Sequence, residues 1–175
     1  FPTSAAVSPG NQTTDAAAFN TADRSKTDHN WDLSALARYV PAATQTYEIG
    51  VAQKTRSPNL YERYTWSTWQ MAALMNNFVG DGNGYVGNLN LEPEVAHTLS
   101  LTADWHDAGN ETWGVKLTPY YTHVKDYIDA VRLPGQTGTT NFVLLQYANQ
   151  SARLYGVDLS GNALLARGTG YGDFT

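Results

Sequence analysis

Residues 91–128 decide the fold, and they read LEPEVAHTLSLTADWHDAGNETWGVKLTPYYTHVKDYI. Two runs in this stretch, at 95–105 and 113–122, alternate between apolar and polar side chains, and a short turn at 107–110 separates them. Such alternation places the apolar residues on one face of a strand. That face would carry Val95, His97, Leu99, Leu101, Ala103 and Trp105, then Trp113, Val115, Leu117, Pro119 and Tyr121. Long strands with aliphatic residues between terminal aromatics are typical of a transmembrane β-barrel, whereas a soluble sandwich uses shorter strands around a filled core.

The composition excludes several classes of protein. The chain has 175 residues, a formal net charge of -5 at pH 7 and no cysteine. A mildly acidic chain argues against nucleic-acid binding, which requires a basic surface, and the lack of cysteine excludes disulfides and thiolate metal sites. No apolar run is long enough for a transmembrane helix. Neither a nucleophile elbow nor a paired-carboxylate motif occurs, so we predict that the protein is not an enzyme.

The alternation extends along the chain and predicts about five strands, joined by turns and loops of alternating length. The strands are expected at about 30–40, 44–55, 95–105, 113–126 and 142–165. Short turns are expected at 41–43, 107–110 and 167–170, and long loops at 1–28, 57–93 and 129–141. Outer-membrane barrels have short periplasmic turns and long external loops, so the loop at 57–93 is predicted to be external. The predicted fold class is all-β: a fragment of a transmembrane antiparallel up-and-down β-barrel, since closing a barrel needs about eight strands.

The membrane-facing surface follows from the same pattern. Six aliphatic residues are predicted to face lipid: Leu99, Leu101, Val115, Leu117, Val157 and Leu159. Aromatic residues are expected near the short turns (Tyr39, Tyr47, Trp105 and Trp113) and near the long loops (Trp31, Tyr121 and Tyr155). Aromatic girdles at both interfaces are a general property of such barrels.

Four motifs resemble those of TonB-dependent outer-membrane receptors, and they follow the family's order over residues 47–160. The strand YEIGVA and the following R-S-P-N-L-Y-E supply Arg56, Pro58, Asn59, Tyr61 and Glu62. The stretch N-L-N-L-E-P-E supplies Asn90, Pro93 and Glu94, with Leu89 and Glu92 in place of the family's usual proline and lysine. P-Y-Y-T with K-D-Y-I supplies Lys125 and Asp126, and the stretch from Tyr147 to Asp158 supplies Asn149 and Gly156.

This resemblance implies that residues 1–175 are part of a receptor barrel domain in the outer membrane of a Gram-negative cell, without the plug domain and the TonB box. It implies an active importer that captures a scarce ligand outside the cell and is driven by TonB through the plug. The implied partners are membrane lipid, the TonB complex and a small ligand or metal ion, with no cofactor. The alternatives are a siderophore or haem receptor of the same family, a passive porin or adhesin barrel, and a soluble glycan-binding module.

The stretch from Met71 to Gly87 resembles the copper-receptor branch of the family, which favours copper as the transported ligand. Ser67-Thr68-Trp69-Gln70 has the spacing of a capping box and predicts a short helix that ends at Asn76 or Asn77. Met71 and Met75 would then lie on one face, and two thioethers suit a soft ion such as Cu(I). Packing inside the loop is the alternative role, because methionine often fills gaps between apolar side chains.

Two further patterns predict no ligand site. Gly82–Gly87 matches G-x-G-x-x-G but lacks the preceding strand that a dinucleotide site needs, so its glycines are expected to permit tight turns. The four histidines are scattered without helical metal spacing, and we expect them at the membrane interface or in loops.

Overall fold

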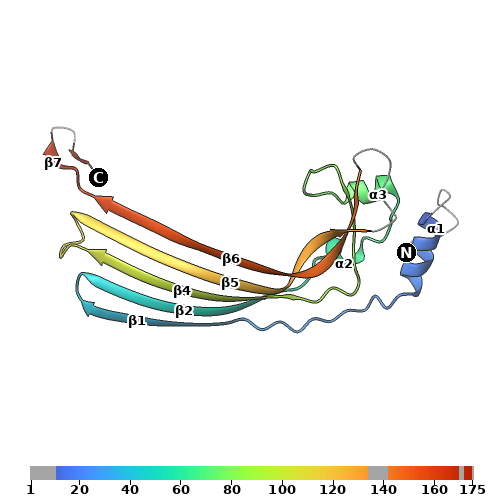
Figure 1. Ribbon diagram of the computed structural model, residues 1–175, viewed down its shortest axis with the longest axis horizontal. Helices are drawn as coiled ribbons and strands as arrows, with labels where there is room; N and C mark the ends of the chain where they lie inside the picture. The colour runs from blue at the N-terminus through green and yellow to red at the C-terminus, as the bar shows by residue number, and fades with distance from the viewer. Residues whose placement is uncertain (1–10, 134–141, 170–171, 175) are drawn as a thin grey trace. The chain divides into compact units, whose positions relative to one another are not determined.

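A computed structural model of the protein describes residues 11–133, 142–169 and 172–174. Its elements, in chain order, are α1 (Asn11–Thr21), β1 (Leu33–Ala42), β2 (Gln45–Arg56), α2 (Leu60–Tyr64), α3 (Gln70–Met75), β3 (Gly84–Val86), β4 (Glu94–His106), β5 (Trp113–Arg132), β6 (Leu144–Ala163), β7 (Ala166–Thr169) and β8 (Gly172–Phe174) (Figure 1). No described helix is long and apolar enough to cross a membrane. The five long strands confirm the predicted all-β fold.

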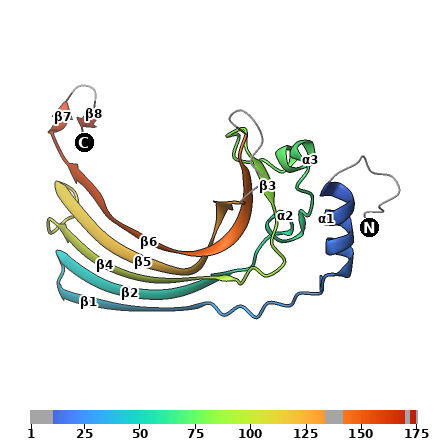
Figure 2. The ribbon, with the colours of Figure 1, turned by 45° about the vertical axis from the view of Figure 1, so that its right-hand side comes forward.

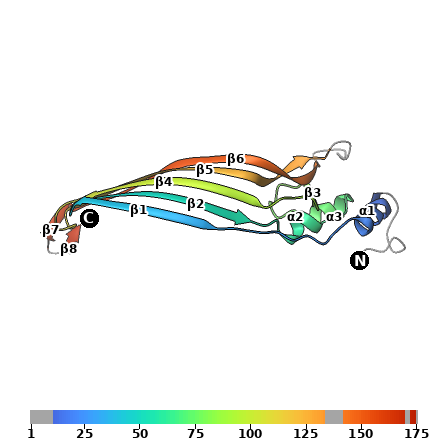
Figure 3. The same ribbon diagram turned by 90° about the horizontal axis from the view of Figure 1, so that it is seen from below.

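The chain divides into two compact units. Unit 1 comprises Phe1–Asn30, Arg56–Glu94 and Lys125–Ser151, and unit 2 comprises Trp31–Thr55, Val95–Val124 and Ala152–Thr175. In unit 1 the helices α2 and α3 lie close to β3 (Figure 2). In unit 2 the strands β1, β2, β4, β5 and β6 lie side by side in that order (Figure 3).

Contacts between the strands of unit 2 define their register. The residue pairs that face one another include Ala37 and Ile49, Tyr39 and Tyr47, Thr44 and His106, Thr98 and Thr122, Thr102 and Thr118, and Thr112 and Leu164. The threonine hydroxyls are 2.8 Å apart in the Thr98–Thr122 pair and 3.1 Å apart in the Thr102–Thr118 pair. Because every strand alternates with a period of two, odd-numbered residues share one face of this sheet and even-numbered residues share the other. The sheet is open among the described residues, since its terminal strand β1 pairs with β2 alone.

The two faces of unit 2 differ as predicted. The odd-numbered residues form an apolar face whose side chains are largely exposed, for example Leu101 at 47% and Leu159 at 71%. Near the short turns, the rings of Tyr47 and Trp105 meet edge to face at 6.0 Å, and the indole N–H donates to the tyrosine hydroxyl at 3.0 Å. The even-numbered residues form a more polar face, on which Arg38 pairs with Glu48 at 2.6 Å, although Leu36 and Leu154 also belong to it. An exposed apolar face of this length is what a barrel presents to lipid.

Gly156, a residue of the fourth motif, lies beneath an aromatic ring on the polar face. A Cβ atom at this position would lie 2.8 Å from the hydroxyl oxygen of Tyr120 and 2.9 Å from two of its ring carbons. The glycine therefore makes room for the tyrosine, which covers the backbone of the neighbouring strand.

We expect Gly156→Ala to destabilise the barrel by about 1–3 kcal/mol, because the added methyl group must displace the Tyr120 ring. Denaturant unfolding of the full-length receptor in detergent measures the change. The loss should shrink in a Tyr120→Ala background, which removes the collision. Gly109→Ala is the control, since a Cβ at that glycine would meet no atom closer than 3.5 Å. An equal loss in both backgrounds contradicts the proposed collision.

Several boundaries differ from the sequence-based prediction. The first turn lies at 43–44, because β1 continues through Pro41 to Ala42. Residues 11–21 form α1 within a stretch that was predicted to be a loop, and the loop at 57–93 contains α2, α3 and β3. The strand β5 extends to Arg132, so it includes the first residues of the loop predicted at 129–141, whose remainder from 134 lies outside the described residues. The turn predicted at 167–170 is wrong, because Ala166–Thr169 is strand β7 and pairs with β8.

Candidate functional site

The N-L-Y-E motif starts α2 with a capping box. The Asn59 side-chain oxygen accepts hydrogen bonds from the backbone N–H groups of Tyr61 and Glu62, both at 2.9 Å. The Glu62 carboxylate accepts the Asn59 backbone N–H at 2.8 Å. The capping box predicted at Ser67 is wrong, because α3 begins after Trp69 without a side-chain cap. The spacing Asn-x-x-Glu at 59–62 was the signal for the true helix start.

Arg56 joins the first motif to the second. Its guanidinium group contacts Glu62 at 3.0 Å and Glu94 at 2.6 Å. Glu94 also accepts the backbone N–H of Ile128 at 2.7 Å, which connects it to the end of the third motif. Three segments that are distant in sequence are therefore held by one arginine and two carboxylates.

Asn149, from the fourth motif, completes this network with a single amide group. Its side-chain oxygen accepts the Glu92 backbone N–H at 2.9 Å. Its side-chain nitrogen donates to the carbonyls of Glu92 and Asp126, at 3.0 Å and 2.7 Å. Asp126 has a φ of 56°, an uncommon value for a residue other than glycine, and its carboxylate lies 3.3 Å from the Lys125 ammonium group.

A second, more buried ion pair attaches the stretch before β1 to α2. The Arg63 guanidinium group donates to both Asp28 carboxylate oxygens, at 2.9 Å and 2.8 Å, and to the Leu91 carbonyl at 2.9 Å. The side chains are 7% and 15% exposed, respectively. The hydrogen bonds from Arg63 lower the pKa of Asp28 below its ordinary value of 3.8. This ion pair could not be predicted, because nothing in the spacing of residues 28 and 63 indicates that they are in contact.

Four other motif residues, Tyr61, Asn90, Pro58 and Pro93, lie outside this network. Tyr61 is exposed, and its ring meets Phe78 edge to face at 4.6 Å. Asn90 is exposed, whereas Pro58 and Pro93 are half-buried. The motif residues Arg56, Glu62, Glu94 and Asn149 thus form a structural network within unit 1.

The two methionines lie on α3 and are exposed, Met71 at 59% and Met75 at 79%. Leu74 and Phe78, two large apolar side chains of the same loop, are also exposed, at 43% and 66%. The buried contacts of this helix come from Ala73 instead. Among the described residues, neither thioether is therefore packed in a core. No group of three or more histidine, cysteine or acidic residues that could hold a metal occurs among the described residues.

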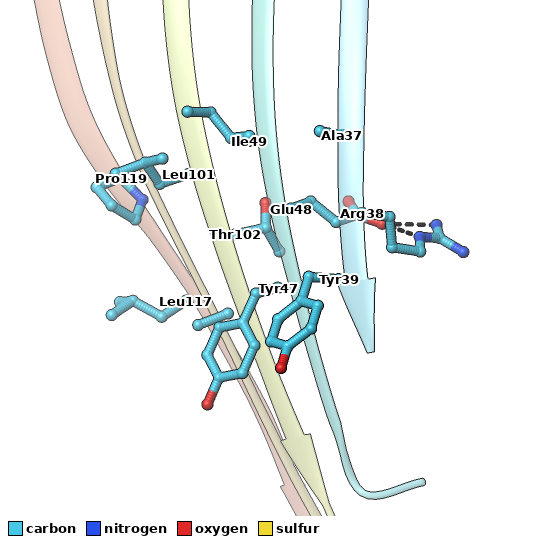
Figure 4. A pocket seen from close by; sticks show the side chains of 11 residues that line it. Ala37, Arg38, Tyr39, Tyr47, Glu48, Ile49, Leu101, Thr102, Leu117 and Pro119 are labelled. Atoms are coloured by element: carbon cyan, nitrogen blue, oxygen red, sulfur yellow. Dashed lines mark hydrogen bonds and ion pairs between the residues drawn. The ribbon is translucent and has the colours of Figure 1, made fainter. Parts of the chain in front are cut away.

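The apolar face of unit 2 carries two shallow grooves. The first has a volume of about 420 Å³, and Figure 4 shows the rings of Tyr39 and Tyr47 side by side at one end of it. Leu101, Leu117 and Pro119 line it from β4 and β5. The second groove has a volume of about 500 Å³ and lies nearer the strand ends that lead to the long loops. Leu33, Ala35, Val51, Leu99 and Tyr121 supply its apolar lining.

Known structures share this fold. A siderophore receptor, PirA from Pseudomonas aeruginosa, has 28% sequence identity and a TM-score of 0.57, with 78% of this chain and 25% of that chain covered. The copper transporter OprC has 16% identity and a TM-score of 0.54 over 76% of this chain and 18% of its own. PirA from Acinetobacter baumannii has 18% identity and a TM-score of 0.53 over 77% of this chain and 21% of its own. The chain thus spans a quarter or less of the length of these receptors.

No curated protein sequence matches the chain. The family described as "TonB dependent receptor-like, beta-barrel" matches residues 5–175. This match covers all four motifs and both units, and it explains an exposed apolar face as a surface that contacts membrane lipid. The chain belongs to the TonB-dependent receptor β-barrel family, whose members are outer-membrane proteins of Gram-negative bacteria.

Proposed function

We propose that the full-length protein is an active importer that takes up a scarce metal, with copper as Cu(I) the favoured cargo. Membership of the TonB-dependent receptor family carries the transport part of this proposal. TonB supplies the energy through a plug domain, and the residues described here contribute barrel wall and external loop. A passive porin or adhesin barrel lacks this energy coupling.

Energy coupling is tested by uptake in intact cells with and without TonB. Accumulation of copper against its gradient should require both the receptor and TonB, and it should stop when a protonophore collapses the proton-motive force. Uptake that persists without TonB contradicts active import and supports a passive barrel.

The copper assignment is supported by the two exposed thioethers on α3. Residues at i and i+4 of a helix have Cβ atoms about 6 Å apart, so Met71 and Met75 could both reach one soft cation. A copper transporter is also among the proteins of similar fold. The acidic and imidazole groups of the described residues offer no competing metal cluster.

We expect Met71→Leu with Met75→Leu to lower copper affinity and uptake, because leucine keeps the apolar volume but removes both sulfur ligands. Volume-conserving replacements typically cost under about 1.5 kcal/mol, so the fold should be kept. Copper binding by calorimetry and copper uptake by cells measure the effect. Leu74→Ile on the same helix, which neither adds nor removes sulfur, is the control for a general change in surface. Unchanged binding and uptake in the double leucine variant contradict the role of these ligands.

A siderophore receptor is the second candidate, and one observation favours it. The PirA receptor of Pseudomonas aeruginosa has higher identity to this chain, 28%, than the copper transporter, 16%. Growth on a ferric siderophore as the sole iron source, compared between cells with and without the receptor, distinguishes the two cargoes. The siderophore assignment is supported if growth requires the receptor while copper uptake is the same with and without it.

A further inference from the structure

A polar row interrupts the apolar face of unit 2 near the strand ends that lead to the long loops. The register places Gln53 of β2 opposite His97 of β4, and His97 opposite His123 of β5. It also places His123 opposite Arg153 of β6. All four side chains are on the odd-numbered face, which contacts lipid. Polar groups at such positions are costly in hydrocarbon unless they reach the interface or a polar partner.

Contacts between the neighbouring strands support this alignment. The Thr98–Thr122 hydroxyl pair lies one residue away from His97 and His123. Between β5 and β6, Leu164 donates its N–H to the Thr112 carbonyl at 2.7 Å. The pairs Gly114–Asn162 and Tyr120–Gly156 continue the same register towards the row.

The acidic side chains of the long strands and the side chain of Arg153 lie on opposite faces of unit 2. Within unit 2, the carboxylates on the long strands β1, β2, β4, β5 and β6 are Glu48, Asp104 and Asp158, which are even-numbered and belong to the polar face. Arg153 is exposed on the apolar face, and its guanidinium group keeps a permanent positive charge. His97 is exposed in the same row and His123 is half-buried, and each adds an imidazole N–H donor. The row therefore presents donors and positive charge without an acidic group on its own face.

The second groove begins at this row. Its lining includes Gln53 and His97 at the polar end, Leu33 directly opposite Gln53, and the aliphatic residues Val51 and Leu99 beyond them. Its volume of about 500 Å³ is open to the lipid-facing side. A donor row joined to an apolar groove matches an amphiphile with an anionic headgroup and a hydrocarbon chain.

We propose that this surface binds one phosphorylated membrane lipid, with its phosphate on the row of His97, His123 and Arg153 and an acyl chain in the adjoining groove. Phosphate oxygens accept charge-assisted hydrogen bonds from guanidinium and imidazole donors. Basic groups at the membrane surface bind anionic lipid headgroups in the same way. Lipid binding here does not depend on which ligand the receptor transports.

Native mass spectrometry of the full-length receptor in a neutral detergent tests the proposal with three probes. These are phosphatidic acid, diacylglycerol with the same acyl chains, and inorganic phosphate. Phosphatidic acid should stay bound where diacylglycerol and inorganic phosphate are lost, because only the first engages both row and groove. Arg153→Gln should weaken phosphatidic acid binding about tenfold or more, since hydrogen bonds to charged groups contribute about 1.5–3 kcal/mol.

Two further variants separate the parts of the site. Ala35→Leu should fill the groove and weaken phosphatidic acid binding while the row stays intact. Lys116→Gln removes a positive charge from the polar face and should leave lipid binding unchanged. Equal retention of diacylglycerol and phosphatidic acid overturns the headgroup assignment. If Lys116→Gln and Arg153→Gln weaken phosphatidic acid binding equally, the lipid does not bind at the row. If the receptor retains inorganic phosphate but not phosphatidic acid, the groove does not hold an acyl chain.

Discussion

Leu101→Arg is expected to destabilise the full-length receptor in a bilayer by about 2–4 kcal/mol, the cost of an arginine on the lipid face near the membrane midplane. Leu101 is 47% exposed on the apolar face of β4 and lines the groove of Figure 4. In the native barrel this exposed surface is covered by hydrocarbon. A guanidinium group placed there loses its hydration without gaining a partner on that face.

Thr102→Arg, one residue further along the strand, is the matched control. Thr102 is half-buried on the polar face, where its hydroxyl lies 3.1 Å from that of Thr118. The substitution removes this hydrogen bond, but the arginine side chain remains among polar groups. We therefore expect a loss of stability of about 1 kcal/mol or less. Reversible unfolding of both variants in lipid vesicles measures the difference. Equal costs at the two positions would falsify the assignment of the faces.

The strands could be predicted because their signal is local. The alternation of large apolar and small polar side chains persists over 95–105 in β4 and 113–122 in β5, so neighbouring residues suffice to assign the faces there. Pro119 shows the limit of such local reasoning. A proline has no backbone N–H to donate and is often found at bulges, but the Thr98–Thr122 and Thr102–Thr118 pairs on either side of it keep one register. The irregular residue of β5 is Asp126, with a φ of 56°.

The candidate sites could be predicted only in part, because they depend on contacts between distant segments. The sequence motifs point to Arg56, Glu94 and Asn149. That these three residues belong to one network follows only from their contacts in the folded chain. The lipid-facing row required the register of four strands, since His97, His123 and Arg153 show no common spacing in the sequence. Residues 60–64 fall within the predicted loop, although Asn59 and Glu62 have the same three-residue capping-box spacing as Ser67 and Gln70.

We expect Arg63→Met to lower the local stability of unit 1 by about 3–5 kcal/mol, the usual consequence of removing one partner of a buried ion pair. Methionine keeps most of the side-chain length but leaves the Asp28 carboxylate, which is 15% exposed, without its two hydrogen bonds. The Leu91 carbonyl loses its donor as well. Hydrogen exchange of the full-length receptor should show faster exchange at 57–93, while β4 in unit 2 keeps its protection.

Burial, rather than distance, should decide the size of this effect. Arg38 and Glu48 are 2.6 Å apart, closer than Arg63 and Asp28 at 2.8 Å, but Arg38 is 62% exposed. Arg38→Met is therefore expected to cost about 1 kcal/mol or less. Acid offers an independent check, because the lowered pKa of Asp28 contributes stability that is present above its ordinary pKa of 3.8 and is lost as the pH falls through the folded value. If Arg63→Met and Arg38→Met have equal effects, or if the Arg63→Met variant keeps the wild-type acid response at 57–93, the ion pair does not hold this segment in place.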